Sequence, residues 1–299
     1  MALEKNLKSG GSNSISWVFS LTALLFVYLL LYCNRPIEID LNPKALIKPT
    51  PSGRFLTNND TLVFNYKLTA LDGFSYFRIQ EASQGILLSV DENQFPDTTI
   101  LDSSFTVLLD PWTPRDTLYF EFLVRDKKGR VGFSRFSYIM ANPIVEISTF
   151  FEYPFQSNSN GFFSQSEKAA YSLTDAGNNS DKIDLGFAFD SVWMVAAPAD
   201  TTFENSFAPE LASWPQRRVS SFDTSDLDLG GFNSLRSDGP IFEGLFDSEN
   251  SSFVDSLQKG LVYEFVTQDL GIGVFVIDST RISSDSTINQ IFCRFKVQE

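Results

Sequence analysis

Apolar and polar residues alternate in short segments between residues 37 and 140, and this period of two predicts β-strands with one buried face. In the clearest segment, Leu118, Phe120 and Phe122 share one face, and Tyr119 and Glu121 share the other. Seven segments of this kind are separated by turn signals: 37–41, 62–69, 75–80, 86–90, 105–109, 118–124 and 131–140. The pattern therefore predicts an all-β fold for this part of the chain.

The connection between the last two segments has the composition of a tight hairpin turn. It reads Asp126-Lys127-Lys128-Gly129, and glycine adopts a positive φ without strain. Seven short strands joined by turns predict an immunoglobulin-like β-sandwich over residues 36–142.

A second β-rich domain, sandwich or jelly-roll-like in form, is predicted for residues 143–299. Its expected strands are 170–173, 182–189, 192–196, 261–267, 273–278 and 288–297. One short helix is expected over 252–259, ending before Gly260. Two stretches, 42–59 and 198–240, are rich in turn-forming residues and are expected to be irregular.

An apolar run of 18 residues without a charge occupies residues 15–32. As a helix it would extend about 27 Å, close to the thickness of a bilayer's hydrocarbon core. No face of the run is polar, so a helix buried in a globular domain is the poorer interpretation. We therefore assign residues 1–35 to a signal or anchor segment.

Three membrane interpretations of this segment differ in what happens at its end. A cleaved secretory signal is disfavoured because the run is long and no A-x-A site follows it. An uncleaved single-pass anchor fits the length. The order of basic residues, apolar run and Leu-Leu-Tyr-Cys33 resembles a bacterial lipoprotein signal, in which Cys33 becomes lipidated, although Tyr32 replaces the usual small residue. We favour the lipoprotein signal and keep the anchor as the alternative, and in both cases the bulk of the chain lies outside the cytoplasm.

Charge is distributed unevenly along the chain. The total is 23 Lys and Arg against 37 Asp and Glu, a formal net charge of −14. Residues 36–142 hold 11 basic and 13 acidic residues, whereas residues 143–299 hold 9 and 23. This shift supports a domain boundary near Asn142. The acidic balance also argues against nucleic-acid binding, which needs clustered Lys and Arg.

The chain contains no histidine, which excludes Ser-His-Asp and Cys-His catalysis and histidine-ligated zinc. Paired carboxylates could hydrolyse glycosides without histidine, but no motif singles out such a pair. Cys293 lies in a predicted strand and is expected to be a small buried apolar residue. A disulfide between Cys33 and Cys293 stays open, and lipidation of Cys33 would prevent it. No CxxC motif and no cofactor motif is present.

Several segments together resemble a known kind of envelope protein. Residues 119–132, Tyr-Phe-Glu-Phe-Leu-Val-Arg-Asp-Lys-Lys-Gly-Arg-Val-Gly, look like the last hairpin of immunoglobulin-like or fibronectin-like modules. Residues 170–173, 182–187 and 261–267 are similar to a carboxy-terminal module of envelope lipoproteins. The chain thus resembles Gram-negative cell-envelope lipoproteins that carry an immunoglobulin-like module before an acidic β-rich module. The resemblance implies an architecture and a place in the envelope, and it brings no catalytic residues.

One acidic segment is a candidate calcium site. Asp223, Asp226 and Asp228 precede the pair Gly230-Gly231, and calcium takes several oxygen ligands from a tight loop. The spacing does not match an EF-hand, so a solvated acidic loop is the alternative. The segment Asp175–Asp184 is a second, weaker candidate for a calcium site, again with a solvated loop as the alternative.

Exposed aromatic residues are the second kind of candidate site, because sugar rings stack on them. Trp214 is expected in a loop, where contact with a ligand or partner competes with packing. Trp193 and Trp112 are expected to pack in the protein, and Arg217-Arg218 to form local ion pairs.

These observations predict a non-enzymatic, membrane-anchored binding or assembly protein on the extracytoplasmic side of a bacterial envelope. Its expected partners are the membrane and a glycan or another envelope protein. The alternatives are an extracellular hydrolase that uses carboxylates and a purely structural spacer.

Overall fold

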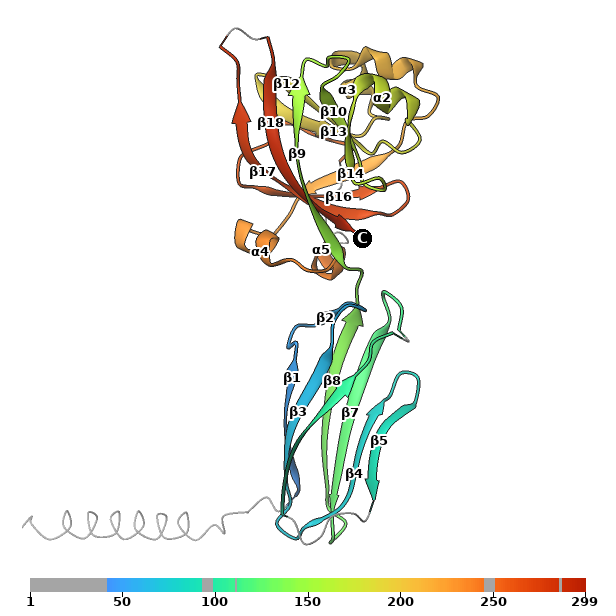
Figure 1. Ribbon diagram of the computed structural model, residues 1–299, viewed down its shortest axis with the longest axis vertical. Coiled ribbons are helices and arrows are strands. Elements are labelled where there is room, and N and C mark those ends of the chain that lie inside the picture. The colour runs from blue at the N-terminus through green and yellow to red at the C-terminus, as the bar shows by residue number, and fades with distance from the viewer. Residues whose placement is uncertain (1–41, 93–98, 111, 245–250, 285–286) are drawn as a thin grey trace, which may run out of the picture. The chain divides into compact units, whose positions relative to one another are not determined.

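The computed structural model describes residues 42–92, 99–110, 112–244, 251–284 and 287–299. Residues 43–299 form one compact unit. Strands dominate it, so the all-β class is confirmed (Figure 1). Among the described residues, no helix is long and apolar enough to span a membrane. The apolar run 15–32, Cys33 and the expected strand 37–41 lie outside the described residues.

Two sheets form the first half of this unit. One has the order β1 (Lys44–Thr50), β3 (Leu62–Thr69) and β6 (Ile100–Val107), and all pairs are antiparallel. The other has the order β2-β8-β7-β4-β5, with bounds Phe55–Leu56, Val131–Met140, Thr117–Asp126, Phe74–Glu81 and Ile86–Glu92. Only the short contact of β2 with β8 is parallel in this second sheet.

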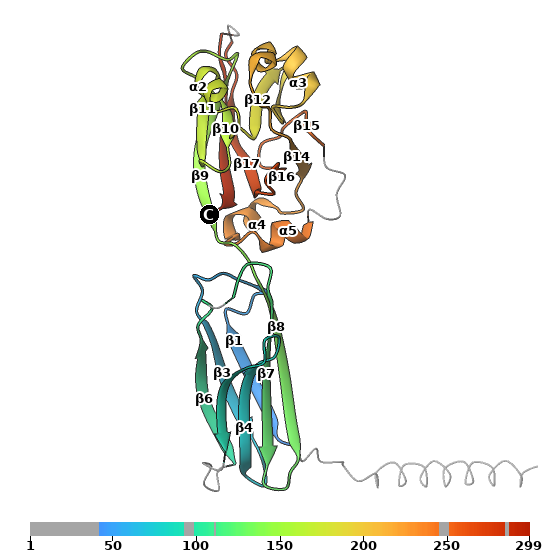
Figure 2. The same cartoon turned by 90° about the vertical axis from the view of Figure 1, so that its right-hand side faces the viewer.

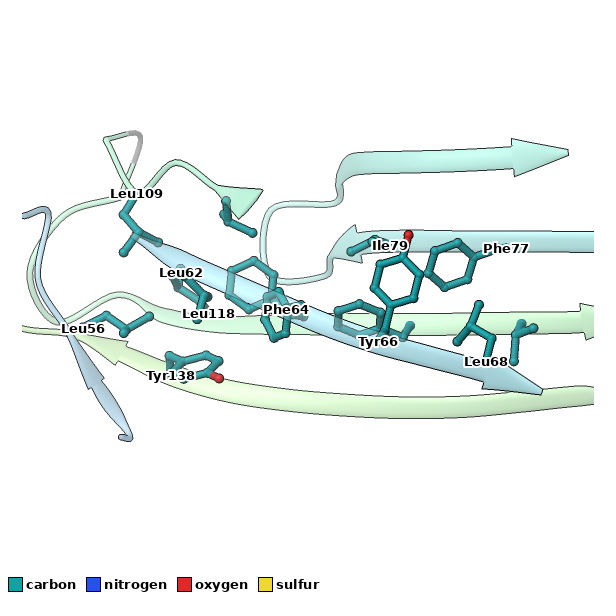
Figure 3. Close-up of a cluster of buried hydrophobic side chains, with 14 of the residues drawn as sticks. Leu56, Leu62, Phe64, Tyr66, Leu68, Phe77, Ile79, Leu109, Leu118 and Tyr138 are labelled. Carbon is teal, nitrogen blue, oxygen red and sulfur yellow. The ribbon is translucent and has the colours of Figure 1, made fainter. Parts of the chain in front are cut away.

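The two sheets enclose one hydrophobic core in which aromatic rings interlock. Phe64 of β3 contacts Phe122 of β7 edge-to-face, with ring centroids 4.9 Å apart (Figure 3). Edge-to-face pairs are favoured because the positive ring edge meets the negative ring face. The alternation read from the sequence explains this core, since Leu118, Phe120 and Phe122 are all fully buried.

Two more sheets form the second half. One has the order β14-β16-β17-β18-β9, with bounds Ser220–Thr224, Val262–Thr267, Ile272–Arg281, Asn289–Gln298 and Ile144–Tyr153. The other has the order β11-β10-β12-β13-β15, with bounds Ala169–Ser172, Asn160–Ser164, Leu185–Asp190, Val192–Ala196 and Phe253–Val254. All pairs in both sheets are antiparallel.

The two sheets of the second half are buried on both faces. Their facing sides share a core in which Phe163 and Phe295 stack with centroids 4.2 Å apart. Short helices cover the other sides (Figure 2): α2 (Leu173–Asn178), α3 (Thr201–Ser206) and the 3-10 helix η1 (Pro209–Ser213) on one, α4 (Leu229–Ser234) and α5 (Gly239–Gly244) on the other. Strands with two buried faces lose the period of two and read as apolar runs.

Three expectations about local structure were wrong. The stretch 42–59 contains β1 and β2, and the stretch 198–240 contains four short helices and β14. The helix expected over 252–259 is absent, and β15 with two turns replaces it. Ser256 has φ 59°, which a right-handed helix does not allow, and the N–H of Leu257 donates to the carbonyl of Trp193.

Candidate functional site

The outward face of the sheet β2-β8-β7-β4-β5 carries arginine and aromatic side chains. Along β4, β7 and β8, buried residues of the core alternate with partly or fully exposed ones. We call the following set of outward residues the arginine–aromatic face: Tyr76, Arg78, Tyr119, Leu123, Arg125, Phe133 and Arg135. Three arginines against Glu121, which lies among them, give this surface a local charge of +2.

Strand register brings these residues into rows that cross three strands. Leu123 of β7 is paired with Arg78 of β4 on one side and with Phe133 of β8 on the other. Arg125 is paired in the same way with Tyr76 and Val131. Cross-strand neighbours on one face lie about 5 Å apart. The side chains therefore form a continuous surface.

Cation–π contacts order two of the arginines. The guanidinium of Arg135 lies 4.4 Å from the ring centre of Tyr119, and that of Arg125 lies 5.7 Å from the ring centre of Tyr76. Arg135 also lies 3.5 Å from a carboxylate oxygen of Glu121. These contacts restrict the rotamers of long side chains, so a partner that binds them loses less side-chain entropy.

An apolar centre lies between the ordered arginines. Phe133 is 55% exposed although it is a large aromatic residue. The Nε of the neighbouring Arg78 is buried and has no hydrogen-bond partner. Tyrosine, phenylalanine and arginine are the residues enriched in protein contact surfaces, where an apolar centre is surrounded by polar groups.

The opposite sheet provides an internal comparison, because its outward face has a different composition. The outward residues of β1, β3 and β6 are Lys44, Leu46, Lys48, Thr50, Val63, Asn65, Lys67, Thr69, Ile100, Asp102, Ser104 and Thr106. None of these is aromatic and none is arginine. Of the two outward faces in this half, the one on β4, β7 and β8 therefore concentrates both kinds of residue.

This face was not identified from the sequence, although part of the signal was present. Tyr119, Glu121 and Leu123 were placed on the non-core side of a predicted strand, and the same period continues to Arg125. Strand pairing that brings Arg78 and Phe133 beside Leu123 cannot be read from one sequence.

Two of the three predicted calcium ligands, Asp228 and Asp223, accept backbone hydrogen bonds. Asp228 is the N-cap of α4 and accepts a hydrogen bond from the N–H of Gly231 at 2.6 Å. Asp223, on β14, accepts from the N–H of Thr224 at 2.6 Å, and Asp226 is exposed in the loop that follows. In the part of the chain that is described, no group of three or more acidic or thiol side chains is placed to hold a metal ion. Calcium binding at these residues stays a prediction.

The segment Asp175–Asp184 contains one capping and one buried carboxylate. Asp175 accepts from the hydroxyl of Ser172, the N-cap of α2. Asp184 is buried and accepts from Arg218 at 2.8 Å and from the N–H of Gln165 at 2.8 Å. Burial raises the pKa of Asp184 even though these hydrogen bonds oppose the rise.

The local ion pairs expected for Arg217 and Arg218 are confirmed. Arg217 pairs with Glu204, and Arg218 bridges Asp184 and Asp269. Arg217 therefore holds its loop to α3, and Arg218 joins the residue before β12 to the turn after β16.

Packing accounts for the positions of the tryptophans. Trp214 is 9% exposed, and its ring centre lies 5.1 Å from that of Phe162. The residue expected in a loop is therefore buried against the protein. Ligand contact through Trp214 stays a prediction. Trp193 and Trp112 are buried as expected. Trp112 borders a recess of about 380 Å³ that Asn58, Asn59 and Pro114 also line, but its burial leaves little ring face for a ligand.

Cys293 is a buried free thiol, as expected for a small apolar core residue. Burial, with a smaller contribution from Asp278, raises its pKa well above the ordinary value. A thiol held in its protonated form is a poor nucleophile, so Cys293 has a packing role.

Buried carboxylates in the described part of the chain are bound by several donors. Asp238 is fully buried and accepts from both terminal nitrogens of Arg115, from the backbone and side chain of Asn142, and from the side chain of Gln298. The guanidinium of Arg115 also lies 3.9 Å from the ring centre of Phe242. A buried charge with this many donors is satisfied in place.

The surroundings of Glu264, like those of Asp184, disfavour the charged form of the carboxylate. Glu264 is 5% exposed, and burial raises its pKa, assisted by repulsion from Asp223 and Asp226. The loop 223–229 therefore concentrates negative charge at Asp223, Asp226 and Asp228.

Comparisons with known proteins give a distant structural likeness. No family model matches the chain, and no curated protein matches it. Among solved structures, the chain is similar to the crystal structure of a DUF4466 family protein from Parabacteroides merdae. That likeness has 15% sequence identity and a TM-score of 0.42, and it covers 86% of this chain and 98% of the other.

Proposed function

We propose that this protein is a non-enzymatic binding or assembly protein whose contact surface is the arginine–aromatic face. One observation carries the proposal: rings and guanidinium groups are gathered on one sheet face and are absent from the outward face of the other described sheet in the same half. The partner class is a protein or glycan of the bacterial envelope.

The proposed architecture is an immunoglobulin-like sandwich followed by an acidic β-rich module with a boundary near Asn142. The strand orders β1-β3-β6 and β8-β7-β4-β5 support it, because an immunoglobulin-like sandwich pairs its strands in this way. The separation of hydrophobic cores supports the boundary: one core draws its residues from Leu56 to Met140, and the others from Ile144 to Val297.

The proposed location is the membrane surface outside the cytoplasm, with residues 1–35 as the attachment. The apolar run and Cys33 support it. Metabolic labelling with a fatty acid, in the wild type and in Cys33→Ala, tests the lipoprotein form. Label in the wild type and none in Cys33→Ala is expected, and an unlabelled wild type would leave the uncleaved anchor.

The contact surface is tested by site-specific photo-crosslinking in the native cell. A photoreactive phenylalanine analogue replaces Phe133, which is 55% exposed on the arginine–aromatic face. The same analogue at Leu46, which is 59% exposed on the opposite sheet, is the matched control. We expect adducts of defined mass from position 133 and few from position 46. Equal labelling at both positions, or none at 133, would count against the proposed function.

A further inference from the structure

The acidic loop 223–229 has a composition complementary to the arginine–aromatic face. It exposes Asp226 and Asp228, and next to them Leu229, which is 42% exposed. The face offers Arg125 and Arg135 beside the apolar Phe133. Each surface thus combines charges of one sign with an exposed apolar side chain.

Charge distribution over the chain favours the same pairing. Residues 143–299 carry a net charge of −14, whereas residues 36–142 carry −2, and the named outward residues of each first-half sheet sum to +2. Charge therefore favours the first half as the partner of the acidic loop, and the arginines ordered by cation–π contacts distinguish the arginine–aromatic face from the opposite one. At physiological ionic strength, charges more than about 8 Å apart are largely screened. The total charges of two copies therefore repel weakly, while opposite charges in direct contact attract.

The environment of Glu264 is consistent with a cationic partner at this loop. Burial raises the pKa of Glu264, and the negative charges of Asp223 and Asp226 raise it further. Arginines placed against the loop would reduce that repulsion.

We propose that the arginine–aromatic face of one copy of this chain binds the acidic loop 223–229 of a second copy. This inference rests on the proposed function of the face and names its partner. The contact joins two different surfaces, so it is heterologous: one copy keeps its acidic loop free and the other keeps its arginine–aromatic face free.

Charge reversal on each side provides the test, with the full chain in detergent and sedimentation velocity as the readout. Arg125→Glu with Arg135→Glu reverses the face, and Asp223→Lys with Asp226→Lys changes the loop 223–229 from −3 to +1 while leaving the cap of α4 at Asp228 intact. Each variant alone is expected to weaken self-association by roughly tenfold or more. Lys48→Glu with Lys67→Glu, exposed on the opposite sheet, is the matched control and is expected to associate like the wild type.

An equimolar mixture of the two reversed variants gives the decisive result. The acidic face of one then meets the basic loop of the other, and the basic face of the second meets the acidic loop of the first. Association is expected to return in the mixture, and a misfolded variant could not produce this rescue. A monomeric wild type, or reversed variants that associate equally well alone, would overturn the proposal.

The outcomes also separate this inference from the proposed function. Adducts from position 133 to another envelope component, with a monomeric wild type, would retain the function and reject the second copy as partner. Absence of any adduct from position 133 would reject the function itself.

Discussion

Asp238 shows how one residue can secure several segments that are distant in the sequence. Its carboxylate is fully buried and binds Arg115, Asn142 and Gln298. A buried ion pair is expensive to desolvate, but removal of one partner is worse because the other charge is left without compensation.

Asp238→Ala is therefore expected to reduce the free energy of unfolding by about 3 kcal/mol. Urea unfolding followed by tryptophan fluorescence measures the change. Asp102→Ala, on the exposed face of β6, is the control and is expected to change stability by less than about 0.5 kcal/mol. An Asp238→Ala variant as stable as the control would show that the hydrogen bonds of this carboxylate contribute little.

Glu264 is expected to make the protein less stable as the pH rises through the folded-state pKa of this carboxyl group. Burial, with repulsion from Asp223 and Asp226, raises its pKa in the folded state. The folded state therefore binds this proton more tightly than the unfolded state does, and ionisation of Glu264 above its folded pKa costs stability. Glu264→Gln removes that cost.

Glu264→Gln should raise the thermal midpoint near pH 7, and the gain should shrink as the pH falls towards the pKa of Glu264. Thermal unfolding from pH 4 to pH 8 checks this, with Glu121→Gln on the outward sheet face as the control. A constant difference between Glu264→Gln and the wild type across this range would contradict the assignment.

At the scale of elements, close packing of rings on the second-half sheets leaves some strand positions open only to glycine. Gly273 of β17 is one of them, because a Cβ there would lie 2.4 Å from the ring of Phe265. Phe265 is fully buried and belongs to the core between the two sheets, so it cannot move aside freely.

Gly273→Ala is expected to destabilise the protein by about 1–3 kcal/mol, since overpacking a core forces neighbours out of their preferred rotamers. Gly53→Ala is the matched control, because nothing lies within 4 Å of a Cβ at that position. Chemical denaturation of both variants provides the measurement. Equal stability of the two would mean that the Phe265 ring relaxes without cost.

The strands predicted in full include two with one solvent-facing side and the largely buried β13 at 192–196, whereas β1 and β9 were missed although one side of each is solvent-facing. Residues 62–69 and 131–140 match β3 and β8 in full, because alternation there reports a single buried face. Strand β10 was missed because it is short and buried at most of its positions, so its sequence shows no alternation of apolar and polar residues. The loop 252–259 was mistaken for a helix, because composition does not reveal the positive φ of Ser256.

Residue chemistry was harder to predict than strands. Single residues such as Cys293 and the pair Arg217-Arg218 behave as their types suggested. The arginine–aromatic face combines residues of three strands, and its members are adjacent only after pairing. A single sequence carries the period of each strand but not the order of the strands.

At the scale of the whole molecule, the heterologous contact that we propose does not close on itself with two copies. Two copies joined in this way leave one face and one loop unused, so further copies can add. If the chain is held at a membrane through residues 1–35, such growth is confined to a layer. The assembly role that we propose would then rest on contacts between the arginine–aromatic face and the acidic loop 223–229.

Cys293 provides an internal reporter of unfolding. Its thiol faces the core at the centre of β18, paired with Ile277 of β17, and it is 1% exposed. A thiol reagent reaches it only when this pair of strands opens, so the rate of labelling measures how often the second half of the protein opens. Cys293 belongs to a core separate from that of the first half, so opening of the first half alone would leave this thiol buried, and labelling at Cys293 would distinguish the opening of one half from that of the other.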